Sequence, residues 1–181
     1  MKARDFDPAR LDVEAFAKTG ASLDGSWPLR CLERFAASAV ALAESDVVGW
    51  RAWGEHRALR GGHPQVWLHL EAKASVMLEC QRCLAPVATE VKAQRSFLFV
   101  HGENSAAELD ADTEDDVLAM THSLDLQELI EDELLLALPL VPRHDVCPEP
   151  LVQGDAVDLP EGDVPHPFAA LAALKRGGLP N

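Results

Sequence analysis

The stretch Leu78-Glu79-Cys80-Gln81-Arg82-Cys83-Leu84 places two cysteines three positions apart, between two segments with the composition of β-strands. Apolar residues alternate with polar ones on its N-terminal side from Val66 to Leu78, and a β-rich run from Val87 to Val100 follows. Such alternation is typical of half-buried strands. Strands joined by so short a connection pair antiparallel, so this stretch predicts a hairpin with the CxxC sequence at its tip.

A third strand is expected before this hairpin, over residues 45–59, and it would complete an antiparallel β-meander. Helices are predicted from Asp7-Pro8 to Lys18, over residues 28–41 and over residues 125–138. Asp125 and Glu128 form a capping-box pattern at the start of the last helix, and its charged residues Glu131, Asp132 and Glu133 are expected to face solvent. Cys31 is expected to be a small buried hydrophobe. The predicted fold class is α+β.

Two further segments are predicted to lie outside this compact part. Residues 101–116 are acidic and poor in apolar side chains, which favours a mobile loop. The sequence becomes Pro-rich and acidic after Cys147, which divides the chain into a domain over 1–147 and a tail over 148–181. A short amphipathic helix is predicted over 167–176, with Phe168, Leu171 and Leu174 on one face and Lys175 at its end. A helix this short needs a surface to dock on, either in its own chain or in a partner.

A second pair of metal-ligating residues, His144 and Cys147, repeats the three-position spacing about sixty residues after Cys80 and Cys83. Two such pairs make a four-ligand set for one structural zinc ion. The alternative is that Cys80 and Cys83 are reduced thiols in a hairpin and that the second pair lies in an unrelated loop. Thioredoxin-like chemistry is disfavoured because it places the CxxC at the start of a helix, whereas Pro86 and a strand follow here.

The net charge of −14 is unevenly distributed along the 181 residues. Residues 1–102 carry 13 Lys and Arg against 12 Asp and Glu, whereas residues 103–163 carry 18 acidic residues against Arg143 alone. The overall field therefore repels phosphate, so any contact with nucleic acid must be local, and the acidic half would attract a basic protein. An acidic surface that serves only solubility is the simpler alternative.

Common catalytic signatures are missing from the sequence, which favours a non-enzymatic role. There is no G-x-G-x-x-G, P-loop, G-x-S-x-G or HExxH pattern. The N-terminus lacks the apolar core of a signal peptide, and no apolar run has the length of a membrane span. The expected location is the cytoplasm, where the cysteines stay reduced.

Three segments resemble the YceD family when they are taken together. They are LECQRCLAPV at 78–87, SLDLQELIEDELLLALPLVPRHDVC at 123–147 and HPFAALAALKR at 166–176. The resemblance implies a role in the accumulation of large-subunit (23S) ribosomal RNA, through its synthesis, processing or stability. It supplies no catalytic residue.

Two modes of action fit this ribosome-biogenesis role. In one, the protein binds ribosomal RNA through basic side chains of the sheet half, namely Arg82 at the CxxC turn together with Arg51, Arg57, Lys92 and Arg95. In the other, the acidic half chaperones a basic large-subunit ribosomal protein. A zinc-stapled protein-interaction module without any RNA contact is the broader form of the second reading. No membrane and no small-molecule substrate is expected as a partner.

Overall fold

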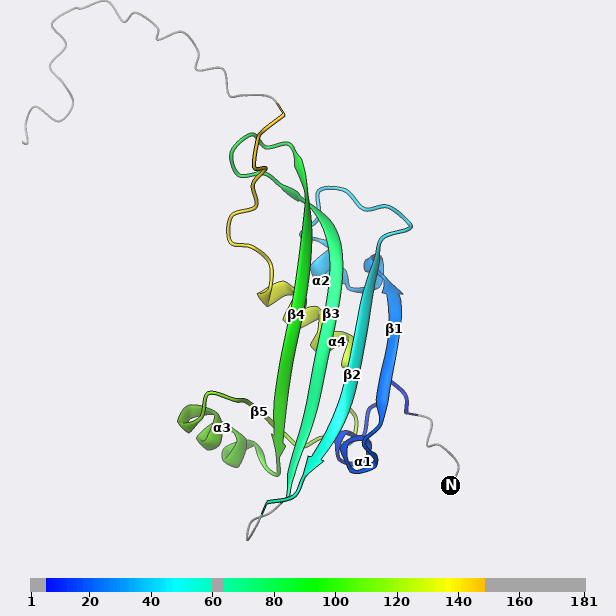
Figure 1. Cartoon of the computed structure of the whole chain (residues 1–181), viewed down its shortest axis with the longest axis vertical. Helices are drawn as coiled ribbons and strands as arrows, with labels where there is room; N and C mark the ends of the chain where they lie inside the picture. The colour runs from blue at the N-terminus through cyan, green and yellow to red at the C-terminus, as the bar shows by residue number, and fades with distance from the viewer. Residues whose placement is uncertain (1–5, 60–63, 149–181) are drawn as a thin grey trace, which may run out of the picture. The chain divides into compact units, whose positions relative to one another are not determined.

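A computed structural model describes residues 6–59 and 64–148 of the chain, and a five-stranded sheet organises them (Figure 1). The strands lie in the order of the sequence, and their bounds are β1 Ser22–Pro28, β2 Val47–Arg57, β3 Gln65–Glu79, β4 Pro86–Val100 and β5 Asp116–Ala119. β1 to β4 form an antiparallel meander, and β5 pairs parallel to β4. The α+β class is confirmed, and so are the three predicted strands.

The pairing of β3 with β4 brings the CxxC turn to one end of the sheet. Val66 pairs with Phe99 at one end of this hairpin, and Glu79 pairs with Pro86 at the other. Cys80 to Ala85 therefore form the tip, as the alternating pattern predicts. Even-numbered residues of β3 face the core and odd-numbered ones face away, which the alternating burial of the strand records.

Helices cover one face of the sheet and bury the main core. Four helical segments lie on this face: α1 Val13–Thr19, the 3₁₀ turn Leu29–Cys31, α2 Glu33–Ala36 and α4 Leu126–Leu136. The α-helices α1, α2 and α4 each bury one large side chain fully against the sheet, namely Phe16, Phe35 and Ile130. α4 begins where predicted, because the Asp125 carboxylate accepts hydrogen bonds from the backbone N–H groups of Gln127 and Glu128.

α1 packs unusually close to β2 at Gly54. A Cβ built on Gly54 would lie 2.6 Å from Cα and 2.7 Å from N of Ala17, both backbone atoms that a side-chain rotation cannot move. The absence of a side chain at position 54 is what lets the helix lie on the strand. Gly20 ends α1 in the left-handed conformation, with φ +60°.

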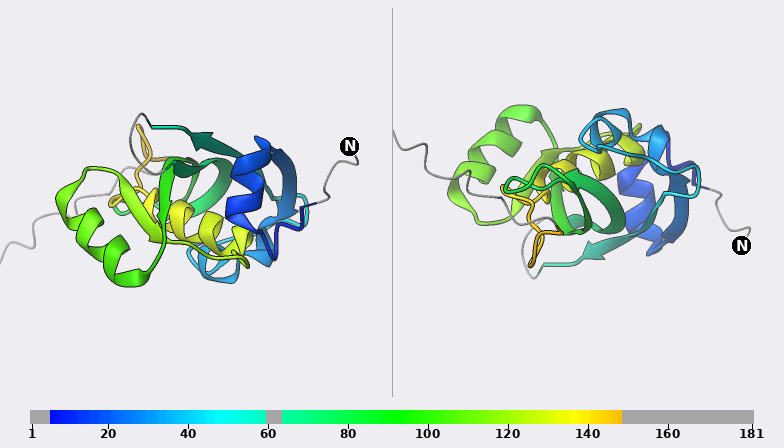
Figure 2. Two further views of the ribbon diagram at one scale, coloured as in Figure 1. Left: turned by 90° about the horizontal axis from the view of Figure 1, so that it is seen from below. Right: turned by 90° about the horizontal axis from the view of Figure 1, so that it is seen from above.

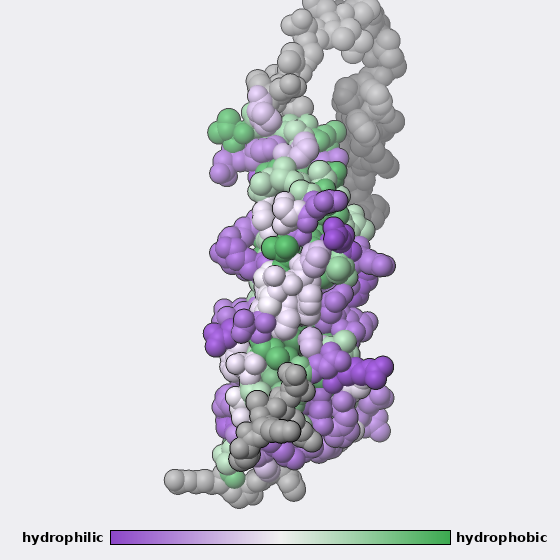
Figure 3. All heavy atoms as spheres, turned by 90° about the vertical axis from the view of Figure 1, so that its right-hand side faces the viewer, coloured by the Kyte–Doolittle hydropathy of each residue, from purple (hydrophilic) through white to green (hydrophobic). Residues whose placement is uncertain are grey.

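A second, smaller cluster lies on the other face of the sheet. α3 Glu103–Asp112 follows β4 and packs Ala106 against Trp67, Leu98 and Val117. Figures 1 and 2 show α3 beside β5, apart from the other helices. Beyond α3, the Trp53 and His69 rings stack with their centroids 5.1 Å apart, and the His69 imidazole also bonds Glu55 and Ser96. Figure 3 shows hydrophilic and hydrophobic side chains mixed over the side of the molecule that it presents.

Several expectations for the N-terminal part were wrong. Helix α1 begins after the cap Asp12, not at Asp7, whose carboxylate instead accepts from Ala9 N in a preceding turn. The predicted helix over 28–41 shrinks to the 3₁₀ turn and α2, because Pro28 ends a strand that the sequence reading missed. Cys31 is exposed, since the side chains of Leu29, Leu32 and Phe35 take the buried positions there.

The acidic half also departs from expectation. Residues 101–116 contain α3 instead of forming an irregular loop, because Ala106 and Leu109 can pack on the sheet. Glu131 and Glu133 are buried, with exposures of 8% and 7%, instead of facing solvent. Each is paired with an arginine: Arg34 reaches Glu131 at 2.9 Å, and Arg95 reaches Glu133 at 3.0 Å. Buried carboxylates need such partners.

Contacts divide the chain into Met1–Pro148 and Glu149–Asn181. The predicted helix over 167–176 lies outside the described residues, together with Phe168, Leu171, Leu174 and Lys175. Among the described helices, none combines the length and the apolar character needed to span a membrane.

Candidate metal centre

The turn between β3 and β4 is closed by backbone hydrogen bonds that turn two cysteine side chains the same way. Cys80 N donates to Ala85 O at 3.0 Å, and Leu84 N donates to Cys80 O at 2.8 Å. Leu84 adopts φ +60°, the only positive φ recorded at a non-glycine residue in the described part of the chain. The left-handed conformation reverses the chain directly after Cys83 and so keeps both thiols on one side of the turn.

The segment after α4 is held against this turn by three hydrogen bonds. Pro142 O accepts from Gln81 N at 2.9 Å, and His144 O accepts from the Arg82 guanidinium at 2.7 Å. His144 Nε2 lies 3.0 Å from Pro86 O, to which it donates. Pro139 and Pro142 end the helix and favour an extended chain, so that residues 139–147 lie beside the hairpin tip.

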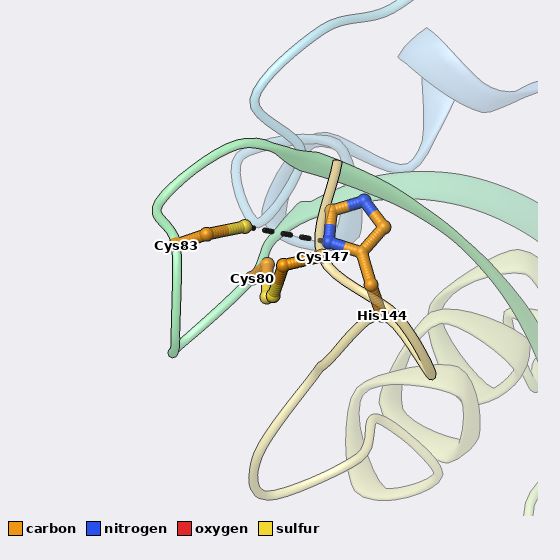
Figure 4. Close-up of side chains that lie close together, drawn as sticks. All are labelled: Cys80, Cys83, His144 and Cys147. Carbon is orange, nitrogen blue, oxygen red and sulfur yellow. Dashed lines mark hydrogen bonds between the residues drawn. The ribbon is translucent and has the colours of Figure 1, made fainter. Parts of the chain in front are cut away.

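These contacts gather Cys80, Cys83, His144 and Cys147 into one cluster (Figure 4). One ligand atom from each lies within 4.8 Å of all the others, and Cys83 Sγ is 3.5 Å from His144 Nδ1. A tetrahedral zinc ion with Zn–S bonds of about 2.3 Å needs thiolates about 3.8 Å apart, so the cluster has the right size. The reading in which the two pairs lie in unrelated places is thereby excluded.

The chemistry of the donors also suits zinc. Three thiols and one imidazole form a Cys3His set, which is typical of structural zinc sites. Because His144 Nε2 carries its proton toward Pro86 O, the lone pair of the neutral ring lies on Nδ1, the atom that faces Cys83. All four positions would be filled by protein atoms, which leaves no open site for a substrate or water.

Hydrogen bonding divides the thiols of the metal-free cluster into different protonation states. Burial opposes ionisation of Cys80, but hydrogen bonds from the backbone of His144, Arg82 and Cys83 outweigh it and lower the pKa of Cys80 to about 5. Burial and hydrogen bonds with the Cys83 and Cys80 sulfurs raise the pKa of Cys147 to about 11. A thiolate at Cys80 is thus stabilised before any cation arrives.

The basic residues predicted as RNA contacts do not gather into one patch. Most already have an acidic or carbonyl partner: Arg57 pairs with Glu55, Lys92 with Glu90, Arg95 with Glu133, and Arg82 with the carbonyl of His144. Arg51 has its guanidinium 5.5 Å from the Trp53 ring centroid. Arg95 lies on the face of the sheet that α4 covers, whereas Arg51, Arg57 and Lys92 lie on the other face.

The ion pairs that join the two halves of the chain were not predicted from the sequence. Glu131 accepts hydrogen bonds from Arg34 N at 2.7 Å and Phe35 N at 3.1 Å, as well as from the Arg34 side chain. The run Glu131-Asp132-Glu133 could have indicated them, because three consecutive acids on a helix that packs against a sheet cannot all face solvent.

The fold and the site together define a small α+β protein whose β-hairpin tip forms a Cys3His cluster with a distant loop. Comparison with known proteins agrees with the resemblance seen in the sequence. Residues 68–175 match the family described as "Large ribosomal RNA subunit accumulation protein YceD". The protein of that name from Haemophilus influenzae is 35% identical over 122 residues, which cover 62% of this chain and 68% of the relative. No solved structure matches the chain.

The chain therefore belongs to the YceD family.

Proposed function

We propose that this protein is a non-enzymatic ribosome-biogenesis factor of the cytoplasm that supports accumulation of large-subunit ribosomal RNA by binding a basic large-subunit ribosomal protein. The relative from Haemophilus influenzae carries large ribosomal RNA subunit accumulation in its name. The choice of a basic protein as the partner rests on the charge of the acidic half. Residues 103–142 contain twelve Asp and Glu and neither Lys nor Arg.

Most of those acids are exposed and form no ion pair with lysine or arginine in this segment of the structure. In this segment only Asp132, Glu131 and Glu133 are bonded to arginine side chains. The others include four exposed residues around α3, which are Glu108, Asp112, Glu114 and Asp115. A basic ribosomal protein that has not yet met RNA would find its charge screened there.

In this proposal the metal centre is structural. One zinc ion held by Cys80, Cys83, His144 and Cys147 would fix the hairpin tip to the segment after α4 and so keep the two halves of the domain in one arrangement. The fully protein-filled ligand set supports a structural ion over a catalytic one.

Direct binding of ribosomal RNA is the second candidate, and one observation favours it. Arg51 is exposed and, within the described residues, is paired with an aromatic ring instead of a carboxylate, which leaves its charge available to a phosphate. Arg82 at the metal centre, Arg57, Lys92 and Arg95 would contribute only after giving up their present partners.

Affinity purification of the tagged chain from cells, with and without ribonuclease, separates the two candidates. Large-subunit proteins that stay bound after ribonuclease treatment support the protein partner; their loss together with the RNA supports direct RNA binding. Two variants with the same change in net charge test the role of the acidic surface.

The first variant should capture less basic protein, and it combines Glu108→Gln, Asp112→Asn, Glu114→Gln and Asp115→Asn.

A control with the same change in net charge removes four exposed acids elsewhere: Asp24→Asn, Glu33→Gln, Glu44→Gln and Glu79→Gln. The control should bind like the unaltered chain. Equal losses in both variants would show that net charge alone acts, and no loss in either would refute the acidic surface as the binding site.

A further inference from the structure

The side of β4 that faces away from β3 is paired along only a small part of its length. β4 has fifteen residues, and β5 pairs with the last four, Phe97 to Val100. Within residues 6–59 and 64–148, no strand pairs with this side of β4 from Pro86 to Ser96, although Pro86 O at its start accepts a hydrogen bond from His144. Figure 1 shows β4 continuing well past the end of β5.

The hydrogen-bonding groups of this open stretch point outward at alternate residues. Val100 O accepts from Met120 N at 2.7 Å, so the even-numbered residues of β4 direct their backbone groups toward the β5 side. The same alternation directs the N–H and C=O groups of residues 88, 90, 92, 94 and 96 to the open edge. All five residues are exposed. An edge of this length is a template for another strand.

The two ends of the open edge differ in chemistry. At one end, β5 begins with Asp116 opposite Phe97, and the exposed Glu114 and Asp115 precede it. At the other end, residues 87–90 and the segment 139–143 line a groove of about 350 Å³. Val141 in this groove is 47% exposed, and the neighbouring Leu140 is fully exposed. Exposed aliphatic side chains of this kind are common at protein-binding surfaces.

We propose that the open edge of β4 is a strand-addition site for an extended segment of the basic partner protein. The segment would form main-chain hydrogen bonds with residues 88–96, place basic side chains near Glu114, Asp115 and Asp116, and place an apolar side chain in the groove beside Val141. This inference rests on the proposed function, because it names where the basic protein binds and in what conformation.

Proline substitution tests the main-chain bonds. Gln94→Pro removes one N–H that points to the open edge and leaves the bonds between β3 and β4 intact, whereas Gln94→Ala keeps the N–H and serves as the matched control. The probe is the mixture of proteins stripped from purified large ribosomal subunits with lithium chloride. Gln94→Pro should bind basic proteins from this mixture about tenfold more weakly than Gln94→Ala.

A second measurement stands independently of whether Gln94→Pro folds. Amide exchange is followed in the unaltered, ¹⁵N-labelled chain, so that only its own signals are seen. Addition of the stripped proteins should slow exchange at Glu90, Lys92 and Gln94. Unchanged exchange at these amides, or equal binding by the two variants, overturns the strand-addition site.

The outcomes keep the two proposals apart. If the unaltered chain binds no stripped protein, the proposed function itself fails. If it binds, and the acid-to-amide variant around α3 loses binding while Gln94→Pro does not, the function stands and the strand-addition site is wrong. A second copy of the chain could also pair along β4. A dimer by light scattering that Gln94→Pro converts to a monomer would therefore overturn the choice of a basic partner.

Discussion

Glu131 is the residue that most directly joins the N-terminal and C-terminal parts of the domain. Its carboxylate accepts hydrogen bonds from two backbone N–H groups at the start of α2 and from the side chain of Arg34. The neighbouring Asp132 binds the same arginine at 2.6 Å but is half exposed. Glu131 and Asp132 therefore bind the same arginine, Glu131 from a buried position and Asp132 from a half-exposed one.

We expect Glu131→Gln to lower the free energy of unfolding by about 1–3 kcal/mol, because an amide cannot satisfy all three donors that now meet a carboxylate. Asp132→Asn should change it by less than about 0.5 kcal/mol, since an exposed ion pair contributes little. Urea unfolding of both variants measures the difference. Equal effects would mean that the backbone contacts of Glu131 add nothing to its ion pair with Arg34.

Cys80 gives the metal-free chain a dependence on pH. Its pKa is lowered from an ordinary value of 9.0 to about 5, so the folded state favours the thiolate. A lowered pKa contributes stability that is present above the ordinary value and is lost as the pH falls toward the folded value. With a chelator present, the unaltered chain should therefore lose melting temperature between about pH 8 and about pH 5 more steeply than Cys80→Ser. Parallel curves would show that the thiolate at Cys80 is not stabilised by folding.

At the scale of the elements, the contact of α1 with β2 depends on a missing side chain. Gly54 leaves no room for a Cβ beside the backbone of Ala17, whereas a Cβ at Gly49 on the same strand would meet nothing within 4 Å. Gly54→Ala should destabilise the protein by about 1–3 kcal/mol, because the helix must move away from the strand. Gly49→Ala should be neutral or slightly stabilising. Thermal unfolding of both decides the matter, and a neutral Gly54→Ala would show that α1 is free to shift.

The sequence predicted those elements whose pattern repeats over many residues and missed those whose structure depends on distant partners. β3 and β4 alternate over their full lengths, and α4 has both a cap and an apolar face, so each could be recognised from local pattern. β1 contains Asp24, Gly25 and Ser26 and has no apolar alternation; it is a strand because β2 pairs with it. α3 forms where an acidic run suggested a loop, because Trp67 and Leu98 provide a surface for Ala106.

The four residues of the Cys3His cluster could be predicted for a similar reason. Cysteine and histidine pairs at fixed spacing are informative whatever the fold, because four soft donors are rarely placed so by chance. The bonds that bring the pairs together could not be predicted, since the contact of Arg82 with His144 O spans about sixty residues and leaves no local pattern. The burial of Glu131 and Glu133 likewise depends on Arg34 and Arg95, which only the folded chain brings near.

At the scale of the whole molecule, the Cys3His cluster joins the two ends of a loop that runs from one end of the sheet, around α3 and α4, and back. Cys83 and His144 are separated by sixty-one positions and meet at 3.5 Å. A zinc ion bound there would make the segment after α4 part of the domain. Without the ion, only a few hydrogen bonds, such as that from Gln81 N to Pro142 O, hold this segment. Segments held by so few contacts open locally.

Trypsin offers a direct test of this coupling, because Arg143 lies between Pro142 and the ligand His144. Removal of zinc with a chelator should speed cleavage after Arg143 by about tenfold or more and should lower the melting temperature. Cys80→Ser should be cleaved quickly with or without the chelator, and it should retain less metal after purification. Cys31→Ser, which alters an exposed thiol outside the cluster, should behave like the unaltered chain. If the purified chain contains no metal and the chelator changes neither cleavage nor melting, then the hydrogen bonds of Gln81, Arg82 and His144 alone hold the segment, and the Cys3His cluster does not bind a structural ion.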